Sequence, residues 1–546
     1  MIKKIFTNQW LWIFSMAIIC TAVLQIPWPC SISVQTHYID SPHTPDGRYV
    51  DYYAEYVRPI EELMNSVKPD ENGCGEMIAA LGRAFCRDMS DEEYQETCQR
   101  LHIDSSAVAP YADYKHVEES LSVDPHFGNN NSIPEFVTRR MKSAGCKIDE
   151  NRDIGEAYYY TILFTPWGDE DCPDAAKWLE KANPVLDILA QAVRKPVFAI
   201  NTGIRTKEGL FNQRILIPVH TEFSFDLQAR IAYRIYQGDS DGAISDCITL
   251  YRLARHIEKN RMNLISGMWA SNIESVASNS IRLMLVSCDL SDSQLRRLQK
   301  ELSELSPRMT LAELYRGNAL EMYDTIQQYT EIDNSELGWF RWLPYDMRAL
   351  RNRFAGTERE LREIVKIENL AVQLEKWVDL EKKWVSSPRA ENLYTSWGRG
   401  ETLAEELYVL IPSYGLTLRH RCKSSARFEL TNIALALYLY KRRNGVFPDT
   451  LQALTPDYLP EIPNDPFTDK PNITYKLNPI SFERWQELRN TQEAKASVSF
   501  LSDLREGINL WQPFELYYWG ENGVDDSLTS AGGFKSPVKT EDNVYW

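Results

Sequence analysis

FSFDLQARIAYRIYQGDSDGAISDCITLYRLARH, residues 223–256, is the stretch that decides the fold class of this chain. Apolar residues recur three and four positions apart over 223–236 and again over 243–256, which is the pattern of a helix with one buried face. The residues between these segments, 237–242, include two glycines and two aspartates, which are common in turns. We therefore expect an αα-hairpin here and a mainly α body around it.

Helix start signals elsewhere favour the same fold class. Capping boxes, in which two side chains three residues apart satisfy free amides of the first helical turn, occur at Ser90–Glu93, Ser291–Gln294, Thr310–Glu313 and Thr357–Glu360. The last box opens an apolar stripe over 357–385, where we expect one long helix that packs lengthwise on its neighbours. Two further segments, 197–201 and 215–219, could form short strands.

Length and charge limit the classes of function. A chain of 546 residues exceeds one ordinary core, so we expect several domains. Hydrophobic residues make up 43% and charged residues 25%, as in folded rather than disordered proteins. The formal net charge of -17 argues against a nucleic-acid partner, because a phosphate backbone attracts basic surfaces.

The first thirty residues predict a membrane segment. Lys3 and Lys4 precede an apolar run over 10–26. Pro27 and Pro29 end the run. Such a run can span a bilayer with tryptophans at its interfaces, and the basic end then stays in the cytoplasm. A cleaved signal peptide is the competing interpretation, because the run is also near that length. Both interpretations place the rest of the chain outside the cytoplasm.

Cysteine usage is compatible with export. Among ten cysteines, Cys74, Cys86 and Cys98 are evenly spaced, and they could pair as disulfides in an oxidising compartment or remain buried thiols. No C-x-x-C pair occurs, so we do not expect a zinc site.

The C-terminal region carries short motifs in a definite order. A helix expected over 425–443 ends at RNGVFP, where Gly445 can adopt the left-handed conformation and Pro448 stops the helix. The segments that follow are LQAL at 451–454, YLP at 458–460, IPNDPF at 462–467, strands expected at 473–477 and 514–519, and GENGVDD at 520–526.

This order resembles the globular domain of the type II secretion major pseudopilins, and the same tail is similar to that of bacterial cell-envelope proteins with long helical bodies. The resemblance covers about a fifth of the chain and implies an α+β module over 425–546 in an extracytoplasmic location. It does not imply assembly into a pilus-like fibre. No glycine precedes Phe6-Thr7 as a processing site, and Trp10 stands where those proteins carry a glutamate.

The resemblance also implies a calcium ion. Major pseudopilins hold calcium in the loops near their last strands, and a hard cation of this kind takes carboxylate and carbonyl oxygens. In this sequence the implied ligands are Asp525, Asp526 and Asp542, with Asn522 or nearby backbone assisting. The alternative is a solvated acidic turn, because Asn-Gly and Asp-Asp are common in turns.

Known catalytic patterns do not occur in the sequence. It contains no G-x-S-x-G, H-E-x-x-H, P-loop or G-x-G-x-x-G pattern. Four histidines have an acid two residues later, a spacing that on a helix points side chains apart, and we interpret them as solvated surface residues: His102, His116, His220 and His256. We assign no catalytic residue and no cofactor, and leave enzyme activity open.

We expect four parts: a membrane anchor or signal over 1–30, a linker over 31–50, a helical body over 51–424 and the α+β module over 425–546. The expected protein is a single-pass inner-membrane protein with most of the chain in the periplasm. Its expected role is that of an envelope scaffold with protein partners. The alternatives are an accessory component of a type II secretion or pilus-like system, and an unrecognised hydrolase.

Overall fold

The structure is a computed structural model. The part that it describes covers residues 51–87, 89–122, 162–200, 217–261, 263–331, 359–385, 399–477, 513–520 and 544–545. The expected anchor over 1–30 and the linker over 31–50 lie outside these ranges. Within them, the chain is mainly helical, as expected. None of the helices described is both long enough and apolar enough to cross a membrane.

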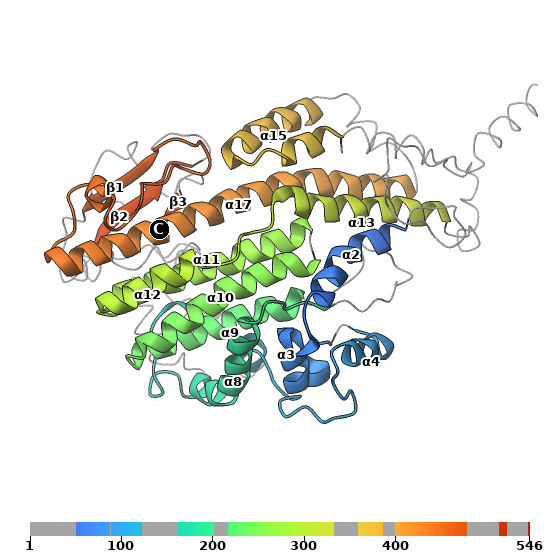
Figure 1. Ribbon diagram of the computed structural model, residues 1–546, viewed down its shortest axis with the longest axis horizontal. Helices are drawn as coiled ribbons and strands as arrows, with labels where there is room; N and C mark the ends of the chain where they lie inside the picture. The colour runs from blue at the N-terminus through green and yellow to red at the C-terminus, as the bar shows by residue number, and fades with distance from the viewer. Residues whose placement is uncertain are drawn as a thin grey trace, which may run out of the picture.

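Three antiparallel helices form the centre of the molecule, and they confirm the hairpin expected over 223–256 (Figure 1). The helices are α9 (Ile217–Tyr236), α10 (Ser240–Arg261) and α11 (Leu264–Ser287). The turn between α9 and α10 contains Gly238 with φ +75°, a conformation that favours glycine. The side chain of Asn263 accepts the N–H of Ser266 and so caps α11.

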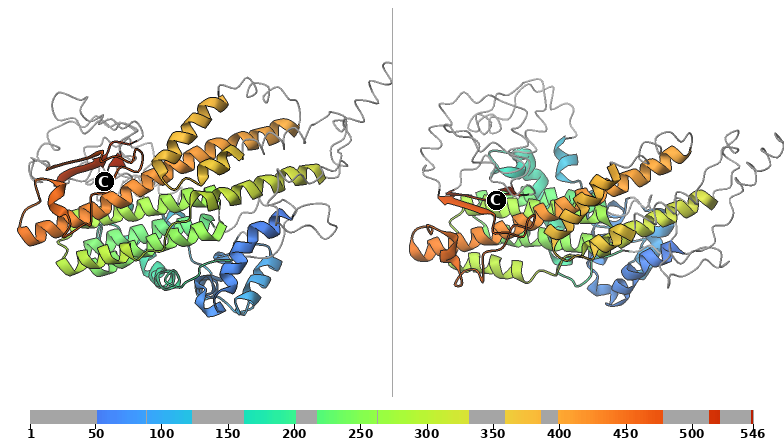
Figure 2. Two further views of the ribbon diagram at one scale, coloured as in Figure 1. Left: turned by 45° about the horizontal axis from the view of Figure 1, so that its top comes forward. Right: turned by 90° about the horizontal axis from the view of Figure 1, so that it is seen from above.

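Helix α17 (Arg399–Asn444) lies along α11 and extends over 46 residues. The views in Figures 1 and 2 agree that it runs from the far end of the helical body to the terminal sheet. The helix expected over 425–443 is its C-terminal half. The expected division between body and module at 424/425 therefore falls inside one continuous helix.

Helices α12 (Asp292–Ser303) and α13 (Leu311–Glu331) follow α11 in sequence, and both pack against α17. Both start at the expected capping boxes, where Gln294 and Glu313 accept backbone N–H groups. The Thr357–Glu360 box lies partly outside the described residues.

The single long helix expected over 357–385 is wrong. Helix α15 begins only at Leu370 and ends at Val385, after a break at 366–369. Two side chains stabilise the break: Asn369 accepts the N–H of Val372 at 3.0 Å, and Gln373 donates to the carbonyl of Ile364 at 3.1 Å. The apolar stripe is still buried on both sides of the break, at Leu361, Ile364, Leu374, Trp377 and Leu380.

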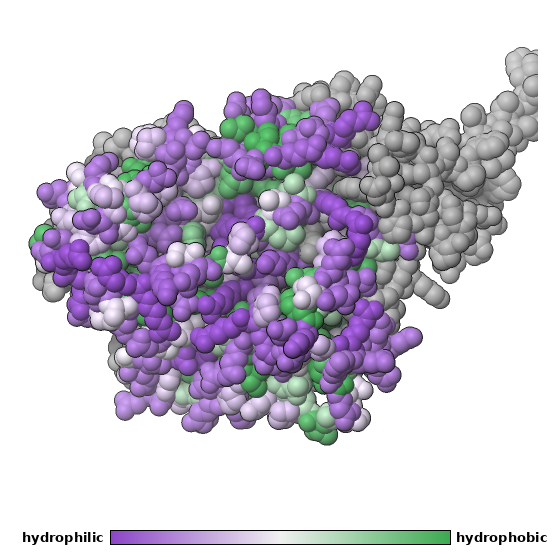
Figure 3. Space-filling view, viewed as in Figure 1, coloured by the Kyte–Doolittle hydropathy of each residue, from purple (hydrophilic) through white to green (hydrophobic). Residues whose placement is uncertain are grey.

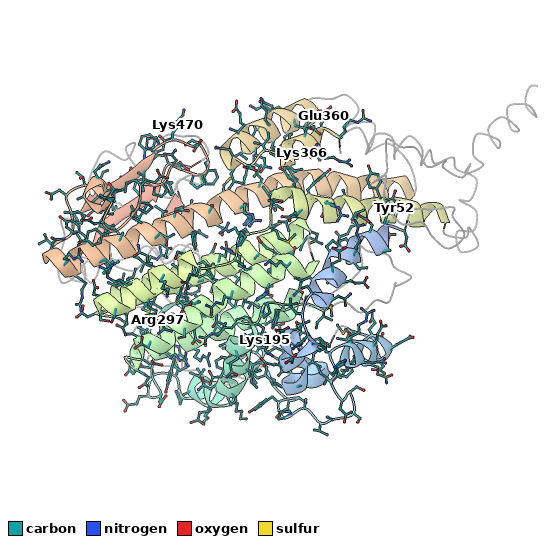
Figure 4. All side chains as sticks on the ribbon, in the orientation of Figure 1. Tyr52, Lys195, Arg297, Glu360, Lys366 and Lys470 are labelled. Carbon is teal, nitrogen blue, oxygen red and sulfur yellow. The ribbon has the colours of Figure 1, made fainter. Side chains whose placement is uncertain are left out.

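Further helices lie on the other side of α9 and α10 (Figure 1). They are α2 (Tyr52–Asn65), α3 (Gly73–Leu81), α4 (Asp91–Arg100), α5 (Val117–Ser122) and α8 (Pro173–Ala192). Tyr52 on α2 stacks on Tyr323 of α13 with ring centroids 5.6 Å apart, and Figure 4 labels Tyr52 at this junction. Single-turn helices lie at Pro69–Glu71, Gly82–Ala84 and Leu451–Leu454.

The short strands considered before α9 are not observed within the described residues. Val197 makes one isolated bridge to Asn72, and 217–219 is the first turn of α9. The terminal sheet is antiparallel in the order β1-β2-β3, with strands Ile473–Leu477, Phe514–Tyr518 and Val544–Tyr545. The sheet packs against α17. The two strands expected at 473–477 and 514–519 are confirmed, and the second ends one residue earlier than expected.

One large apolar core receives residues from most of the described elements, and a second, smaller apolar cluster lies mainly between α2 and α13. Hydrophilic residues dominate the face shown in Figure 3, and apolar patches between them are small. Close contacts inside the core depend on a few glycines. At Gly415 on α17, a Cβ atom would overlap the indole nitrogen of Trp377, which is fully buried.

Gly415→Ala is expected to destabilise the protein by about 1–3 kcal/mol, because the rigid indole has to move for the methyl group to fit. At Gly75 the atoms nearest to an added methyl group would lie 3.9 Å away, so Gly75→Ala should be neutral or stabilising by up to about 1 kcal/mol. Urea unfolding of both variants measures the difference. Equal stabilities would show that α15 does not pack on Gly415.

Candidate functional site

The three residues proposed as calcium ligands, Asp525, Asp526 and Asp542, lie outside the described residues. Within the described ranges, no group of three or more histidine, cysteine, aspartate or glutamate side chains is arranged to hold a metal ion. The described chain does reach Gly520, the first residue of the GENGVDD segment.

A buried carboxylate holds Gly520 in place. Asp465, from the Pro-Asn-Asp-Pro turn, accepts the N–H of Phe467 at 2.9 Å and that of Gly520 at 3.2 Å. Burial raises the pKa of Asp465 to about 6, against the lowering effect of these two hydrogen bonds. Asp465 therefore connects the IPNDPF segment at 462–467 with the start of the GENGVDD segment, although it lies 55 residues before Gly520.

Two buried glutamates form the centre of an ion-pair cluster in the helical body. Glu258 on α10 accepts Arg421 Nη1 at 2.5 Å and the backbone N–H of Met309 at 2.9 Å. Glu274 on α11 accepts Ser424 Oγ of α17 at 2.5 Å. Both glutamates are 1% exposed, so their charges need partners inside the protein.

Three arginines supply those partners. Arg421 of α17 also donates to the carbonyl of Met309 at 2.6 Å, and Arg255 and Arg308 both pair with Glu274. Arg255 donates through Nε to the carbonyl of Ser306 at 2.9 Å. Burial, followed by the nearby charge of Arg308, lowers the pKa of Arg255 to about 9. The cluster fixes α10, α11, α17 and the connection before α13 relative to one another.

A second buried group of charges joins α8, α9 and α10. Arg230 donates to both oxygens of Asp246, at 2.9 and 2.7 Å, and to Asp187 at 2.7 Å. Arg234, one helical turn further along α9, donates to Asp246 at 2.8 Å. Burial is the main influence on Asp246 and raises its pKa, although both arginines oppose this effect. Arg230 and Asp246 are each 1% exposed, whereas the side chain of Asp187 is 58% exposed, so the group runs from the interior to the surface.

The third group also reaches the surface, and because it contains a histidine it is the candidate functional site. His116, just before α5, places Nδ1 2.5 Å from Asp226 Oδ2 and Nε2 3.1 Å from Glu222 Oε2. Asp226 also accepts Tyr114 Oη at 2.7 Å and the N–H of Val117 at 2.8 Å. Glu222 accepts Arg87 Nη2 at 2.6 Å. Asp226 is fully buried, whereas the side chains of Glu222 and Arg87 are 26% and 43% exposed.

The electrostatics of this site favour the protonated imidazole. Burial lowers the pKa of His116, but the charge and hydrogen bond of Asp226 and the charge of Glu222 outweigh it, so the pKa lies above its usual value of 6.5. Burial and the charge of Asp226 raise the pKa of Tyr114 well above its usual value, so Tyr114 remains a hydroxyl donor.

The chemistry available to His116 follows from these contacts. Both ring nitrogens face carboxylates in the described structure, so the imidazolium has no lone pair with which to take a proton from a nucleophile. A general base next to a serine or cysteine is therefore not the arrangement found here. What the site can do is bind or release one proton between two carboxylates, one buried and one near the surface.

The interpretation of four histidines as solvated surface residues is wrong for two of them. His116 is 8% exposed, and its partners lie 110 and 106 residues away rather than two. His256 is half-buried, with Nε2 3.0 Å from the carbonyl of Val193, and burial lowers its pKa to about 4. His102 is exposed, as expected. A signal for the site was present in Asp226, a charged residue on the apolar face of α9.

The described cysteines are thiols, and six of the seven are buried. Burial raises the pKa of Cys74 well above its usual value and that of Cys86 to about 12, so both resist ionisation. Of the two alternatives for Cys74, Cys86 and Cys98, the structure has the buried thiols.

Comparison with known proteins gave no relative: no family model, curated protein or solved structure matches this chain.

Arg421→Met is expected to lower the free energy of unfolding by about 3–5 kcal/mol, because it leaves the buried Glu258 carboxylate without a cation. Arg252→Met provides the matched control. Arg252 pairs with Glu301 at 2.7 Å, but both side chains are more than a quarter exposed, so the loss should stay within about 1 kcal/mol. Denaturant unfolding distinguishes the two results. Similar losses in the two variants would contradict a special dependence of stability on the buried cluster.

Proposed function

We propose that this chain is a membrane-anchored, extracytoplasmic scaffold or protein-interaction protein of the bacterial envelope. The observation that supports the proposal best is α17, which packs on α11 in the body and on the strands of the terminal sheet. Because one continuous helix belongs to both regions, it fixes the distance between the helical body and the terminal sheet. That property suits a protein that holds partners at a fixed separation.

Polar contacts support the same interpretation by fastening the sheet region to the body. Gln299 on α12 donates to the carbonyl of Tyr458, in the segment between α17 and β1, at 2.9 Å. The residue before α15, Asn369, donates to Asp469 at 2.8 Å. These contacts reach separate segments of the body, so the sheet region cannot rotate about α17 without breaking them.

The accessory role in a type II secretion or pilus-like system remains the second candidate. It is favoured by the antiparallel sheet packed on a helix, which is the arrangement that the pseudopilin resemblance implies for 425–546. In this proposal the sheet region docks onto subunits of such a system while the helical body remains outside the fibre.

The anchor is tested by membrane extraction. Full-length protein should resist alkaline carbonate, because the apolar run over 10–26 stays in the bilayer. A chain starting at residue 51 behind a cleavable export signal should appear in the soluble periplasmic fraction. Recovery of both proteins in the soluble fraction would contradict the anchor and favour the cleaved signal.

The same extracts test the scaffold. Mild detergent should release the full-length protein in a complex of defined mass, and His116→Gln should leave that mass unchanged because a scaffold needs no reacting group. Turnover of ester, glycoside or peptide substrates by purified 51–546 would instead assign the protein to the hydrolases.

We also propose that Asp525, Asp526 and Asp542 bind calcium. Because α17 belongs to both parts, the test uses residues 51–546 rather than an isolated module. Calcium should raise the melting temperature relative to chelator, since a ligand of the folded state stabilises it by about 2.7 kcal/mol at a hundred times its Kd. Asp525→Asn should remove the response and the exposed Asp457→Asn should keep it. Identical melting temperatures with calcium and with chelator would contradict the site.

A further inference from the structure

The terminal sheet has an open edge. In the order β1-β2-β3, β3 packs on α17, whereas β1 lies at the opposite edge and pairs with β2 alone among the described strands. An edge strand presents a row of unpaired N–H and C=O groups, which is a template for one further strand. We propose that β1 pairs with β1 of a second copy of this chain, so that two terminal sheets join into one. This interface goes beyond the scaffold function and does not depend on it.

The register of β1 on β2 shows which backbone groups face outward. Asn472, just before β1, accepts the N–H of Trp519 at 3.1 Å. These two residues continue the register in which Ile473 lies opposite Tyr518. Since hydrogen bonding alternates along an antiparallel strand, every second residue of β1 from Thr474 onward bonds to β2. The residues whose backbone groups point outward are Ile473, Tyr475 and Leu477.

These outward groups are available to another strand. Each of the outward-facing residues carries one N–H donor and one C=O acceptor on the side away from β2. Within the part of the chain that the structure describes, no other backbone group bonds to them. The side chain of Leu477 is 41% exposed, so apolar surface lies beside the unpaired backbone groups. The edge therefore offers both hydrogen bonds and an apolar contact.

Two copies of β1 complement each other in an antiparallel pair centred on Tyr475. That pair places Tyr475 opposite Tyr475 of the second copy, and Ile473 opposite Leu477 of the second copy. Each of these is a hydrogen-bonded pair, so all of the outward N–H and C=O groups find partners. Aromatic and apolar residues directly opposite each other stabilise a sheet. The pair has a two-fold axis, which is the usual symmetry of a dimer of identical chains.

The charges on β1 select this register. Lys476 is exposed, and a lysine in an edge strand usually discourages pairing with another chain. Here Lys476 lies opposite Glu515 on β2, and in the register centred on Tyr475 it lies opposite the neutral Thr474 of the second copy. A register centred on Lys476 would place the two lysines directly opposite each other, and like charges there are destabilising. Charge therefore favours the one register that also pairs the apolar residues.

Sedimentation of 51–546, which contains every described residue, tests the dimer. One strand pair buries less surface than the roughly 1,600 Å² of a standard interface, so we expect weak association. The average mass should rise toward twice the monomer value as the protein concentration increases.

Hydrogen exchange on the same samples locates the interface. The outward amides of 473, 475 and 477 should exchange about twofold more slowly when half of the chains are paired, because only the monomer exposes them. The amides of 474 and 476 bond to β2 in monomer and dimer alike, so their exchange should not depend on concentration.

Leu477→Pro blocks the edge, because proline lacks the outward N–H and takes no hydrogen bond from β2. This variant should stay monomeric at every concentration. Leu477→Thr is the matched control, since it alters the same side chain but keeps the N–H, and it should still dimerise. Unchanged exchange at 474 and 476 in both variants shows that the sheet remains folded.

A wild-type protein that stays monomeric would overturn the proposal and leave the edge to a strand of another protein. Outward amides that are already protected in the dilute monomer would also overturn it, because another segment of the same chain then occupies the edge. A dimer that persists in Leu477→Pro, or one that leaves exchange over 473–477 unchanged, would place the interface elsewhere.

Discussion

The carboxylates of Glu258 and Glu274 impose the strictest constraint on this structure. Each is removed from water, and an ionised carboxylate in that position requires cations and N–H groups at hydrogen-bond distance. The partners come from α10, α17 and the connection around Arg308 and Met309. Apolar surfaces alone tolerate sliding of one helix along another. These charges meet in one register, so the position of α17 along α11 is determined where Arg421 and Ser424 reach the two glutamates.

The need to pair buried charges also determines the contacts of α9, and the partners differ between its two halves. Arg230 and Asp246 are both 1% exposed and meet through two hydrogen bonds, and Arg230 also reaches the exposed Asp187. At the other end, the contacts of His116 lead from buried Asp226 to Glu222 near the surface. The first arrangement resists change over a wide pH range, because an arginine stays charged. The second contains a histidine and can respond.

Local patterns predicted the local features of the fold well. Periodicity indicated the hairpin of α9 and α10, and the capping boxes at Ser291 and Thr310 indicated the starts of two helices, because both signals depend on residues a few positions apart. The break before α15 was missed since the apolar stripe continues across it and Gln373 compensates from the following turn. The extent of α17 was also missed, because it is set by packing on α11.

The candidate site could not be predicted from local sequence. Asp226 could have been recognised as a charge on an apolar face, but its partner His116 lies 110 residues earlier, and no local spacing relates the two. The acids two residues after the histidines carry no information about these contacts, because on a helix that spacing points the side chains apart. The calcium ligands inferred from the pseudopilin resemblance remain a prediction. Near them, the described structure shows the hydrogen bond from the N–H of Gly520 to Asp465, which positions the start of the GENGVDD segment.

The shared helix α17 also dictates an order of assembly during biosynthesis. Helices α9 to α11 are complete at Ser287, but the helix that covers α11 begins more than a hundred residues later, at Arg399. At 5–20 residues per second, the chain takes on the order of ten seconds to supply it. Throughout that interval the apolar side of α11 and the charges of Glu258 and Glu274 lack their final cover. We therefore expect the nascent chain to keep this surface uncovered until α17 has been synthesised.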